Sequence, residues 1–184
     1  MTARSVLQQA DITRALTRIS HEILESNRGS RDLVLLGIPT RGVILATRIA
    51  DILNGIEPGS AVAGALDVTM YRDDLSRNPT RTPSPTQIPD GGIDGKTVVL
   101  VDDVLYSGRT IRSALDAIND IGRPRVVRLA ALVDRGHREL PIRADFVGKN
   151  LPSSSEERIN VHLVEIDACD EVTIEGHSDE VTIE

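Results

Sequence analysis

Segments that are almost wholly apolar alternate along this chain with segments in which apolar residues recur every three or four positions. Three segments are of the first kind: residues 33–38, 98–101 and 126–133. They are typical of strands buried on both faces of a parallel sheet. Three more predict amphipathic helices: residues 12–23, 43–53 and 111–118. This alternation predicts an α/β fold, with a mostly parallel twisted sheet flanked by helices.

The remaining elements carry weaker patterns. Val6 and Leu7 predict a short opening strand, and Asp11 is expected to be the N-cap of the first helix. Residues 64–70 and 161–166 are interpreted as two further strands. All of these elements fit a single domain over residues 1–175.

Two segments lack the periodicity of helix or strand. Residues 71–89 contain four prolines, and a loop of this length inside a compact domain is usually functional, so we expect a mobile lid or a disordered connector. At the other end, the motif DEVTIE occurs at residues 170–175 and again at 179–184. The first copy is expected to complete a sheet, and residues 176–184 are expected to form a disordered acidic tail.

Composition narrows the class of protein. The 184 residues are 40% hydrophobic but only 2% aromatic, so the core is expected to be aliphatic and of ordinary size. A single cysteine excludes an internal disulfide framework. Because no apolar segment approaches the length of a membrane span, we expect a soluble cytoplasmic protein.

The formal net charge of −7 is concentrated near one end. Residues 156–184 hold ten acidic residues and one basic residue, which leaves the rest of the chain slightly basic. The overall charge argues against indiscriminate binding to nucleic acid, but it leaves room for a basic face on the body of the domain. The acidic end is interpreted as solvent-exposed.

The apolar run at the centre of the chain leads into the most informative motif. Residues 97–110 read TVVLVDDVLYSGRT, an apolar strand that ends at Asp102 and Asp103 and is followed by a loop of small residues and a helix. Ligands of open α/β sheets bind at the carboxyl ends of the strands. Loop amides and a helix N-terminus hold phosphate, whereas carboxylates accept hydrogen bonds from ribose hydroxyls and help to hold magnesium. The motif therefore predicts a sugar-phosphate site.

A second turn between strand and helix is expected at the same edge of the sheet. It reads Gly37-Ile38-Pro39-Thr40-Arg41-Gly42 and follows the first buried strand. Its amides and the Arg41 guanidinium are suited to a second anion. Alone, such a turn is usually only a connection, and its residues indicate no more than a second anion site.

Residues 98–110 resemble the motif with which type I phosphoribosyltransferases bind phosphoribosyl diphosphate (PRPP). Four further stretches extend the resemblance: LTRISHE at 16–22, GIPTRG at 37–42, YRDDL at 71–75 and LVDRGHRELPIRADFVGKN at 132–150. Together they are similar to the subfamily of bifunctional pyrimidine operon regulators that are also uracil phosphoribosyltransferases. The resemblance covers about residues 10–175.

The resemblance implies a type I phosphoribosyltransferase fold with a flexible loop that closes over PRPP. It also implies a small hood, formed by the opening segment and about residues 135–165. The implied catalytic residues are Asp102, Asp103, Arg41 and Arg72. The implied PRPP-binding residues are Thr40, Arg41, Gly42, Val98, Val99, Leu100, Val101, Asp102, Asp103, Val104, Leu105, Tyr106, Ser107, Gly108, Arg109 and Thr110. Arg135 is expected at the base, and Mg2+ is expected at Asp102 and Asp103 indirectly, through ribose hydroxyls or water.

A basic surface is the second implied site. The resemblance assigns six residues to messenger RNA: Thr17, Arg18, His21, Arg138, Arg143 and Lys149. On spacing alone, Arg14, Arg18 and His21 would be an ordinary solvated helix face. Two positions depart from the family pattern: Ser26 stands where an arginine is frequent, and Pro152 is followed by three serines instead of a threonine, a serine and a cation.

The expected reaction joins uracil to PRPP and gives UMP and diphosphate. The expected partners are PRPP, uracil, UMP or UTP and a pyrimidine operon mRNA leader, and the protein is expected to be a homodimer or a higher homo-oligomer. Three alternatives stay open. The enzyme could act on another base, or the protein could be an RNA-binding regulator that uses the PRPP pocket only as a nucleotide sensor. A generic doubly wound domain is the least favoured, because two buried carboxylates without a ligand are costly.

Overall fold

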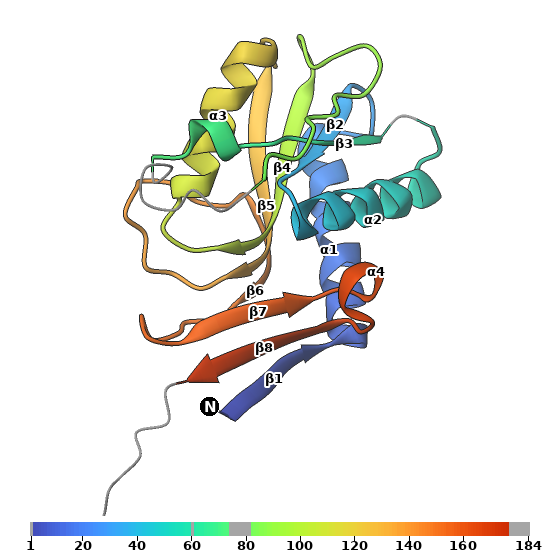
Figure 1. Ribbon diagram of the computed structural model, residues 1–184. Helices are drawn as coiled ribbons and strands as arrows, with labels where there is room; N and C mark the ends of the chain where they lie inside the picture. Colours follow the sequence, from blue (N-terminus) through green and yellow to red (C-terminus); the bar gives the residue numbers. More distant parts are fainter. Residues whose placement is uncertain (1, 60, 74–81, 177–184) are drawn as a thin grey trace, which may run out of the picture.

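Two sheets of unequal size organise the chain in the computed structural model, which describes residues 2–59, 61–73 and 82–176 (Figure 1). The large sheet is parallel, with strand order β3-β2-β4-β5-β6, and the small sheet is antiparallel, with order β1-β8-β7. The strands are β1 Thr2–Gln8, β2 Leu33–Gly37, β3 Val62–Ala65, β4 Thr97–Leu105, β5 Val126–Asp134, β6 Phe146–Asn150, β7 Arg158–His162 and β8 Glu171–Gly176. The helices are α1 Gln9–Asn27, α2 Arg41–Ile56, α3 Arg109–Ile121, the short α4 Val164–Asp167 and the 3-10 turn η1 Thr69–Tyr71. The expected α/β architecture is confirmed.

The central strand β4 is buried on both faces, as its sequence predicts. Val99 and Val101 pack into the apolar layer formed with α1 and α2. Val98 and Leu100 point the other way and join the layer formed with α3. Because successive side chains of a strand alternate between the two faces, one apolar run supplies both layers. The acidic motif that follows this strand is therefore held by a core on each side.

The opening of the chain differs from the expectation. β1 runs to Gln8 because it pairs along its length with β8, an interaction that local sequence does not reveal. Gln8, in extended conformation, is therefore the N-cap of α1. The Gln8 amide donates to Oδ2 of Asp11 at 3.0 Å, so Asp11 lies in the first turn and stabilises the start of the helix from there. The prediction that Asp11 is the N-cap was wrong by three positions.

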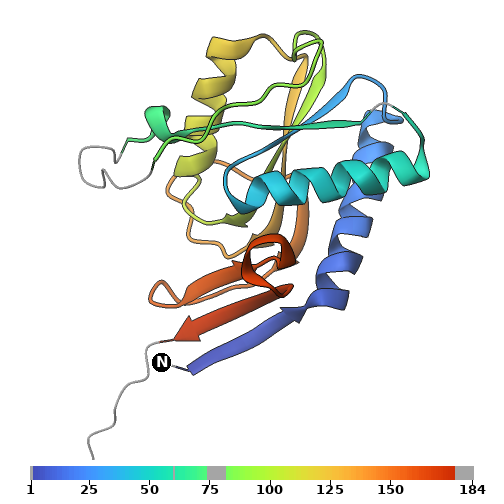
Figure 2. The ribbon, with the colours of Figure 1, turned by 45° about the vertical axis from the view of Figure 1, so that its right-hand side comes forward.

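The residues expected to form the hood are divided between the two sheets. Phe146–Asn150 pairs with β5 and is the edge strand of the large sheet, so only part of residues 135–165 belongs to the small one. The strand expected at 161–166 ends at His162, and Val164–Asp167 is helical. The first DEVTIE copy forms β8 and completes the small sheet, as expected. Figures 1 and 2 show α1 extending from the small sheet along the large one.

The strand expected at 64–70 is shorter and begins earlier. It covers Val62–Ala65 and is followed by a turn in which Oδ1 of Asp67 accepts the Thr69 amide at 3.1 Å and the Thr69 hydroxyl at 2.6 Å. These bonds compete with strand pairing and end it. The expected lid returns at Gln87, which exchanges two backbone hydrogen bonds with Ala65. Its central residues, including Arg77 and Arg81, and the tail at 177–184 lie outside the described residues.

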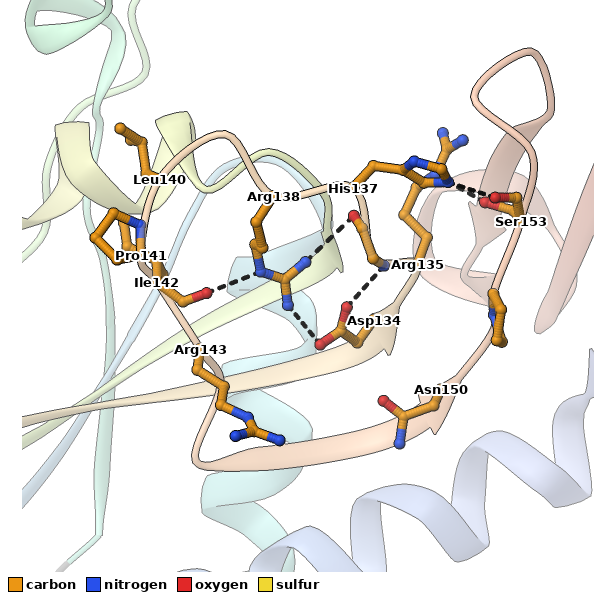
Figure 3. Close-up of a pocket in the computed structure, with 12 residues that line it drawn as sticks. Asp134, Arg135, His137, Arg138, Leu140, Pro141, Ile142, Arg143, Asn150 and Ser153 are labelled. Atoms are coloured by element: carbon orange, nitrogen blue, oxygen red, sulfur yellow. Dashed lines mark hydrogen bonds and ion pairs between the residues drawn. The ribbon is translucent and has the colours of Figure 1, made fainter.

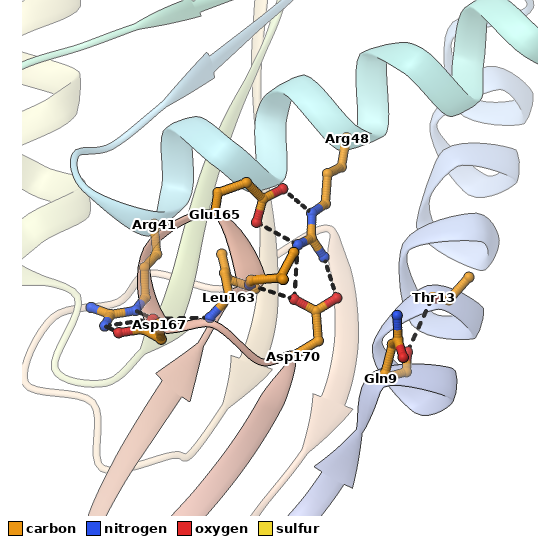
Figure 4. Close-up of polar contacts among 9 residues, drawn as sticks. Gln9, Thr13, Arg41, Arg48, Leu163, Glu165, Asp167 and Asp170 are labelled. Atoms are coloured by element: carbon orange, nitrogen blue, oxygen red, sulfur yellow. Dashed lines mark hydrogen bonds and ion pairs between the residues drawn. The ribbon is translucent and has the colours of Figure 1, made fainter.

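Acidic residues near the carboxyl end of the chain join the small sheet to α2, which corrects their interpretation as a solvent-exposed end. Arg48 of α2 donates to Glu165 at 2.5 and 2.8 Å and to both oxygens of Asp170 at 2.8 Å (Figure 4). The Asp170 side chain is only 6% exposed. Hydrogen bonds from Arg48 lower the pKa of both carboxyl groups, and the two carboxylates raise the pKa of Arg48.

We expect Asp170 to make stability depend on pH. Its pKa is lowered by folding, so its contribution is present above the unfolded-state pKa and is lost as the pH falls through the folded-state pKa, below about 4. At pH 7, Asp170→Asn should lower the free energy of unfolding by about 1.5 kcal/mol, a typical value for a hydrogen bond to a charged group. Urea unfolding at pH 7, 5 and 3.5 should show this difference shrinking with acidity. Parallel pH profiles for the two proteins would contradict the assignment.

Within the described residues, no helix combines the length and the apolar composition that crossing a bilayer requires.

Candidate active site

The acidic pair lies inside β4, whereas the sequence places it at the end of the strand. Pairing with β5 continues through Asp102 to Leu105, but the neighbour on the other side, β2, stops at Gly37 opposite Val101. Asp102 and Asp103 therefore stand where the sheet has lost one neighbour. From β2 the chain builds the sheet in one direction, to β3, and from β4 it builds the sheet in the opposite direction, to β5 and β6. The strand order therefore reverses between β2 and β4. Such a switch point is where α/β sheets bind ligands.

Backbone groups hold the two carboxylates in different settings. Asp102 is buried, and its Oδ1 accepts the Asp103 amide at 2.9 Å. Asp103 is half-buried, and its Oδ1 accepts the Val104 amide at 2.8 Å. Each side chain is thus fixed by the peptide that follows it. A carboxylate held in this way is suited to accept hydrogen bonds from a sugar hydroxyl.

The turn after β2 packs directly against this pair. The Ile38 amide donates to the Val101 carbonyl at 2.9 Å, which continues the register of the sheet into the turn. A Cβ on Gly42 would lie 2.5 Å from the Val101 carbonyl oxygen and 3.4 Å from Cα of Asp102. Only glycine allows this approach. The structure therefore places Gly42 beside Asp102, whereas the Arg41 side chain pairs with Asp167 of α4, and binding of diphosphate by this turn stays a prediction.

The loop from Tyr106 to Thr110 closes over the end of β4 and starts α3. Gly108 has φ +91°, a left-handed conformation that favours glycine, and it is the residue before the helix. The Ser107 carbonyl accepts hydrogen bonds from the amides of Glu139 and Leu140 at 3.0 and 3.2 Å, so the loop that follows β5 holds Ser107 in place. The first amides of α3 consequently lie at the carboxyl edge of the sheet, beside the acidic pair.

A cavity of about 280 Å³ lies between Asp102 of β4, the loop at residues 106–110 and the first turn of α3. Its walls are Arg72, Asp73, Asp102, Ser113 and all residues from Val104 to Ile111. The Arg109 guanidinium is paired with two carboxylates, Asp73 in the same cavity wall and Glu139, each at 2.5 Å. The ion pair between Asp73 and Arg109 also connects the described start of the 71–89 loop to the loop at residues 106–110.

Arg135 lies on the other side of Tyr106. It is buried, its guanidinium carbon lies 4.3 Å from the centre of the Tyr106 ring, and it donates to the Ser153 hydroxyl and the Ser154 carbonyl at 3.0 and 2.7 Å. These two bonds use a hydroxyl and a backbone carbonyl, so they do not depend on the departure from the family pattern. Arg135 therefore joins the Tyr106 end of the phosphate loop to the segment that leads into β7.

A larger cavity of about 860 Å³ opens beside Arg135 (Figure 3). Residues 134–143 form most of its wall, without Glu139, and Asn150, Pro152 and Ser153 complete it. Arg138 is tied into this wall: it donates to Asp134 at 2.5 Å and to the carbonyls of Ile142 and Tyr106 at 2.8 Å. Arg138 thus shapes the loop that supports residues 106–110, whereas Figure 3 shows Arg143 extending away from this network.

Four of the six residues expected at RNA lie on two elements that pack side by side, α1 and β6. Arg18 of α1 donates to the carbonyls of Val147 and Gly148 in β6 at 3.1 and 2.6 Å. His21 and Lys149 are exposed on these same two elements. Thr17 is half-buried, and its hydroxyl donates to the Thr13 carbonyl. The structure thus brings helix and strand together, and Arg143 lies in the segment that enters β6.

Sequence reasoning missed two polar partners of the site. Glu139 pairs with Arg109, and Asp167 of α4 pairs with Arg41. Asp167 lies 126 positions from Arg41, and nothing in the local pattern of residues 164–167 predicts that pairing. The only available signal was the cluster of acids at 165–170, which by itself is equally typical of a solvated segment.

The acidic pair fits the requirements of a magnesium ion that arrives with its substrate. Among the described residues there is no cluster of three or more His, Cys, Asp or Glu side chains that could hold a metal by itself. Mg2+ is usually bound through one or two carboxylates together with substrate phosphates and water. Asp102, which lines the cavity, and its neighbour Asp103 supply that number of carboxylates.

Comparisons with known proteins agree with this geometry. Residues 2–165 match the family described as the phosphoribosyl transferase domain. A protein named bifunctional protein PyrR from Leifsonia xyli subsp. xyli is 71% identical over 180 residues, which cover 95% of this chain and 98% of the relative. A protein of the same name from Streptomyces coelicolor is 63% identical over 94% of this chain and 89% of the relative. A crystal structure of a hypoxanthine-guanine phosphoribosyltransferase from Bacillus anthracis superposes with a TM-score of 0.68 at 16% identity, covering 94% of this chain and 98% of that chain, and so shares the fold.

Proposed function

This chain belongs to the phosphoribosyltransferase family and is similar over nearly its whole length to bifunctional PyrR proteins, and on that premise we propose that it converts uracil and PRPP to UMP and diphosphate. One observation carries the proposal. The cavity of about 280 Å³ joins a carboxylate on β4 to the amides that begin α3, and Arg72 lines it as well. A sugar phosphate needs these two kinds of group a short distance apart.

The reaction needs positioning and charge stabilisation more than a covalent nucleophile. Uracil N1 forms a bond to the anomeric carbon, the bond from that carbon to diphosphate breaks, and the N1 proton is lost. We expect the amides and hydroxyls of residues 106–110 to hold the 5-phosphate, and Asp102 and Asp103 to hold the ribose hydroxyls near the developing positive charge. Arg41 and Arg72 are expected to stabilise the departing diphosphate.

The uracil base is expected on the side of residues 106–110 that faces Arg135. Uracil presents alternating carbonyl and N–H groups, which backbone amides and carbonyls can recognise. Magnesium, when bound, neutralises charge on the diphosphate oxygens. In this chain Asp102 and Asp103 would hold it, through ribose hydroxyls or water.

An assay with uracil and PRPP, with and without magnesium, tests the proposal. We expect UMP only when all three are present. Hypoxanthine, guanine and adenine serve as competing bases, because the fold alone is shared with purine enzymes. Preferential use of a purine would favour the alternative substrate, and the absence of product with every base would leave the PRPP site as a nucleotide sensor.

A second proposed function is binding to the leader of pyrimidine biosynthetic mRNA, enhanced by UMP. The observation that favours it is the packing of α1 on β6, which gathers exposed cationic side chains on two adjacent elements. Arg18 is already fixed on the β6 carbonyls, so its position costs little entropy on binding. RNA loops are recognised through phosphates and unstacked bases, which such a face can contact.

Arg143→Ala and Lys149→Ala test the RNA-binding face without disturbing the phosphate loop. Each should weaken binding to the leader RNA and reduce the slope of log affinity against log salt by about 0.7, the value for one phosphate contact on a single strand. Filter binding at several salt concentrations measures both quantities, and the uracil assay should be unchanged. Arg138→Ala is a less specific probe, because that side chain holds the loop together. An unchanged affinity and salt slope in the Arg143→Ala, Lys149→Ala double variant would count against this face.

A further inference from the structure

Arg41, the first residue of α2, forms an ion pair with Asp167 of α4, the short helix that connects β7 to β8 of the small sheet (Figure 4). Nη2 of Arg41 lies 2.9 and 3.0 Å from the two carboxylate oxygens, and Nε lies 3.3 Å from Oδ2. Both side chains are mostly buried, with 30% of Arg41 and 19% of Asp167 exposed. A charge-assisted pair with this many contacts fixes the plane of a guanidinium and not only its approximate place.

Asp167 is itself held in place. Its Oδ2 accepts the Leu163 amide at 2.9 Å, and its own amide donates to the Leu163 carbonyl at 2.7 Å. That amide and, to a smaller extent, Arg41 keep the pKa of Asp167 below its ordinary value, so it is ionised at neutral pH. His162, whose Nδ1 lies 4.0 Å from Oδ1, is the other titratable group in contact.

The pair leaves one end of the Arg41 fork for a ligand. Asp167 engages the Nε and Nη2 side, and within the described residues Nη1 makes no hydrogen bond. The helix that carries Asp167 is fixed on α2 by the Arg48 contacts with Glu165 and Asp170. The position of α4 therefore does not depend on Arg41, and Asp167 can act as a support for that arginine.

We propose that Asp167 is a positioning residue for the transferase reaction: it orients Arg41 from the small sheet so that the exposed end of the guanidinium meets the diphosphate of PRPP. This inference rests on the proposed function. It gives the segment between β7 and β8 a part in diphosphate binding. A hood that only covered the base would have no such part. A guanidinium oriented in advance loses less conformational entropy when the substrate binds.

Asp167→Asn keeps the shape of the side chain and removes its charge. We expect the KM for PRPP to rise by roughly tenfold, equivalent to about 1.4 kcal/mol, while the KM for uracil changes little. Asp167→Glu should recover part of the loss, because the carboxylate returns with a longer reach. Asp51→Asn is the matched control: it removes an exposed carboxylate from α2, the helix that begins at Arg41, and it should leave the KM for PRPP unchanged.

A double-mutant cycle distinguishes positioning from a general structural role. In an Arg41→Ala background, Asp167→Asn should have no further effect on the KM for PRPP, because Asp167 acts through Arg41. Additive losses, or tighter PRPP binding by Asp167→Asn, would overturn the proposal; the second result would mean that the carboxylate competes with diphosphate. An inactive wild-type protein would instead refute the proposed function, and binding of PRPP measured by calorimetry without uracil would then still test the Arg41–Asp167 coupling.

Discussion

Asp103→Asn is expected to reduce kcat/KM for UMP formation by about 10²- to 10³-fold, the range seen when one preorganised electrostatic contact to a transition state is removed. The neutral amide still accepts the Val104 amide, so the backbone of β4 should keep its course. What is lost is the negative charge beside the ribose, which both accepts sugar hydroxyls and faces the positive charge that develops on the sugar. A loss of this size in kcat/KM, with an unchanged unfolding temperature, is the expected pattern.

Two controls accompany the Asp103→Asn measurement. Asp116→Asn removes an exposed carboxylate from α3 and should leave activity unchanged, which separates a local effect from a change in net charge. RNA affinity without nucleotide should also stay the same in Asp103→Asn, because the basic face lies on α1 and β6. If Asp103→Asn retained activity within about threefold, equivalent to about 0.7 kcal/mol, the acidic pair would not be the sugar site.

Gly37→Ala is expected to have the largest effect on stability. A Cβ at this position would lie 2.3 Å from both the Gly42 carbonyl oxygen and Cα of Val43. Both are backbone atoms, so the turn and the start of α2 would have to move. Overpacking of this kind costs about 3 kcal/mol, and for a chain of this size each kcal/mol lowers the unfolding temperature by about 2–4 °C. We therefore expect a fall of roughly 6–12 °C by calorimetry, and a loss of UMP formation because Gly42 moves away from the acidic pair.

Gly55→Ala is the matched control on the same helix that Gly37 packs against. A Cβ there meets no atom within 4 Å, and alanine is favoured over glycine inside a helix by about 0.5–1 kcal/mol. The two substitutions add the same atom, so a neutral or stabilising Gly55→Ala would show that the position, and not the methyl group, decides the result. Equal unfolding temperatures for the two variants would mean that the turn can adjust, contrary to the packing described.

Most of the large sheet could be predicted from the sequence because its strands are apolar on both faces. The run before Asp102 and Asp103 supplies two core layers by simple alternation, and the small-residue loop after it has few uses other than anion binding. The motif at 98–110 therefore indicated both a strand and a site. The small sheet was harder to predict, because β1 and β8 pair with each other over a long sequence separation that no local pattern shows.

The sequence alone determined the family, the acidic pair and the small-residue loop at residues 106–110, because each depends on consecutive residues whose chemistry is local. Only the tertiary structure decided that Asp102 and Asp103 lie beyond the end of β2, next to the Arg41 turn. It also decided that acids near the carboxyl end fix α4 and hold Arg41. Ion pairs between segments more than one hundred positions apart depend on how the two sheets pack, and no pattern of neighbouring residues specifies that.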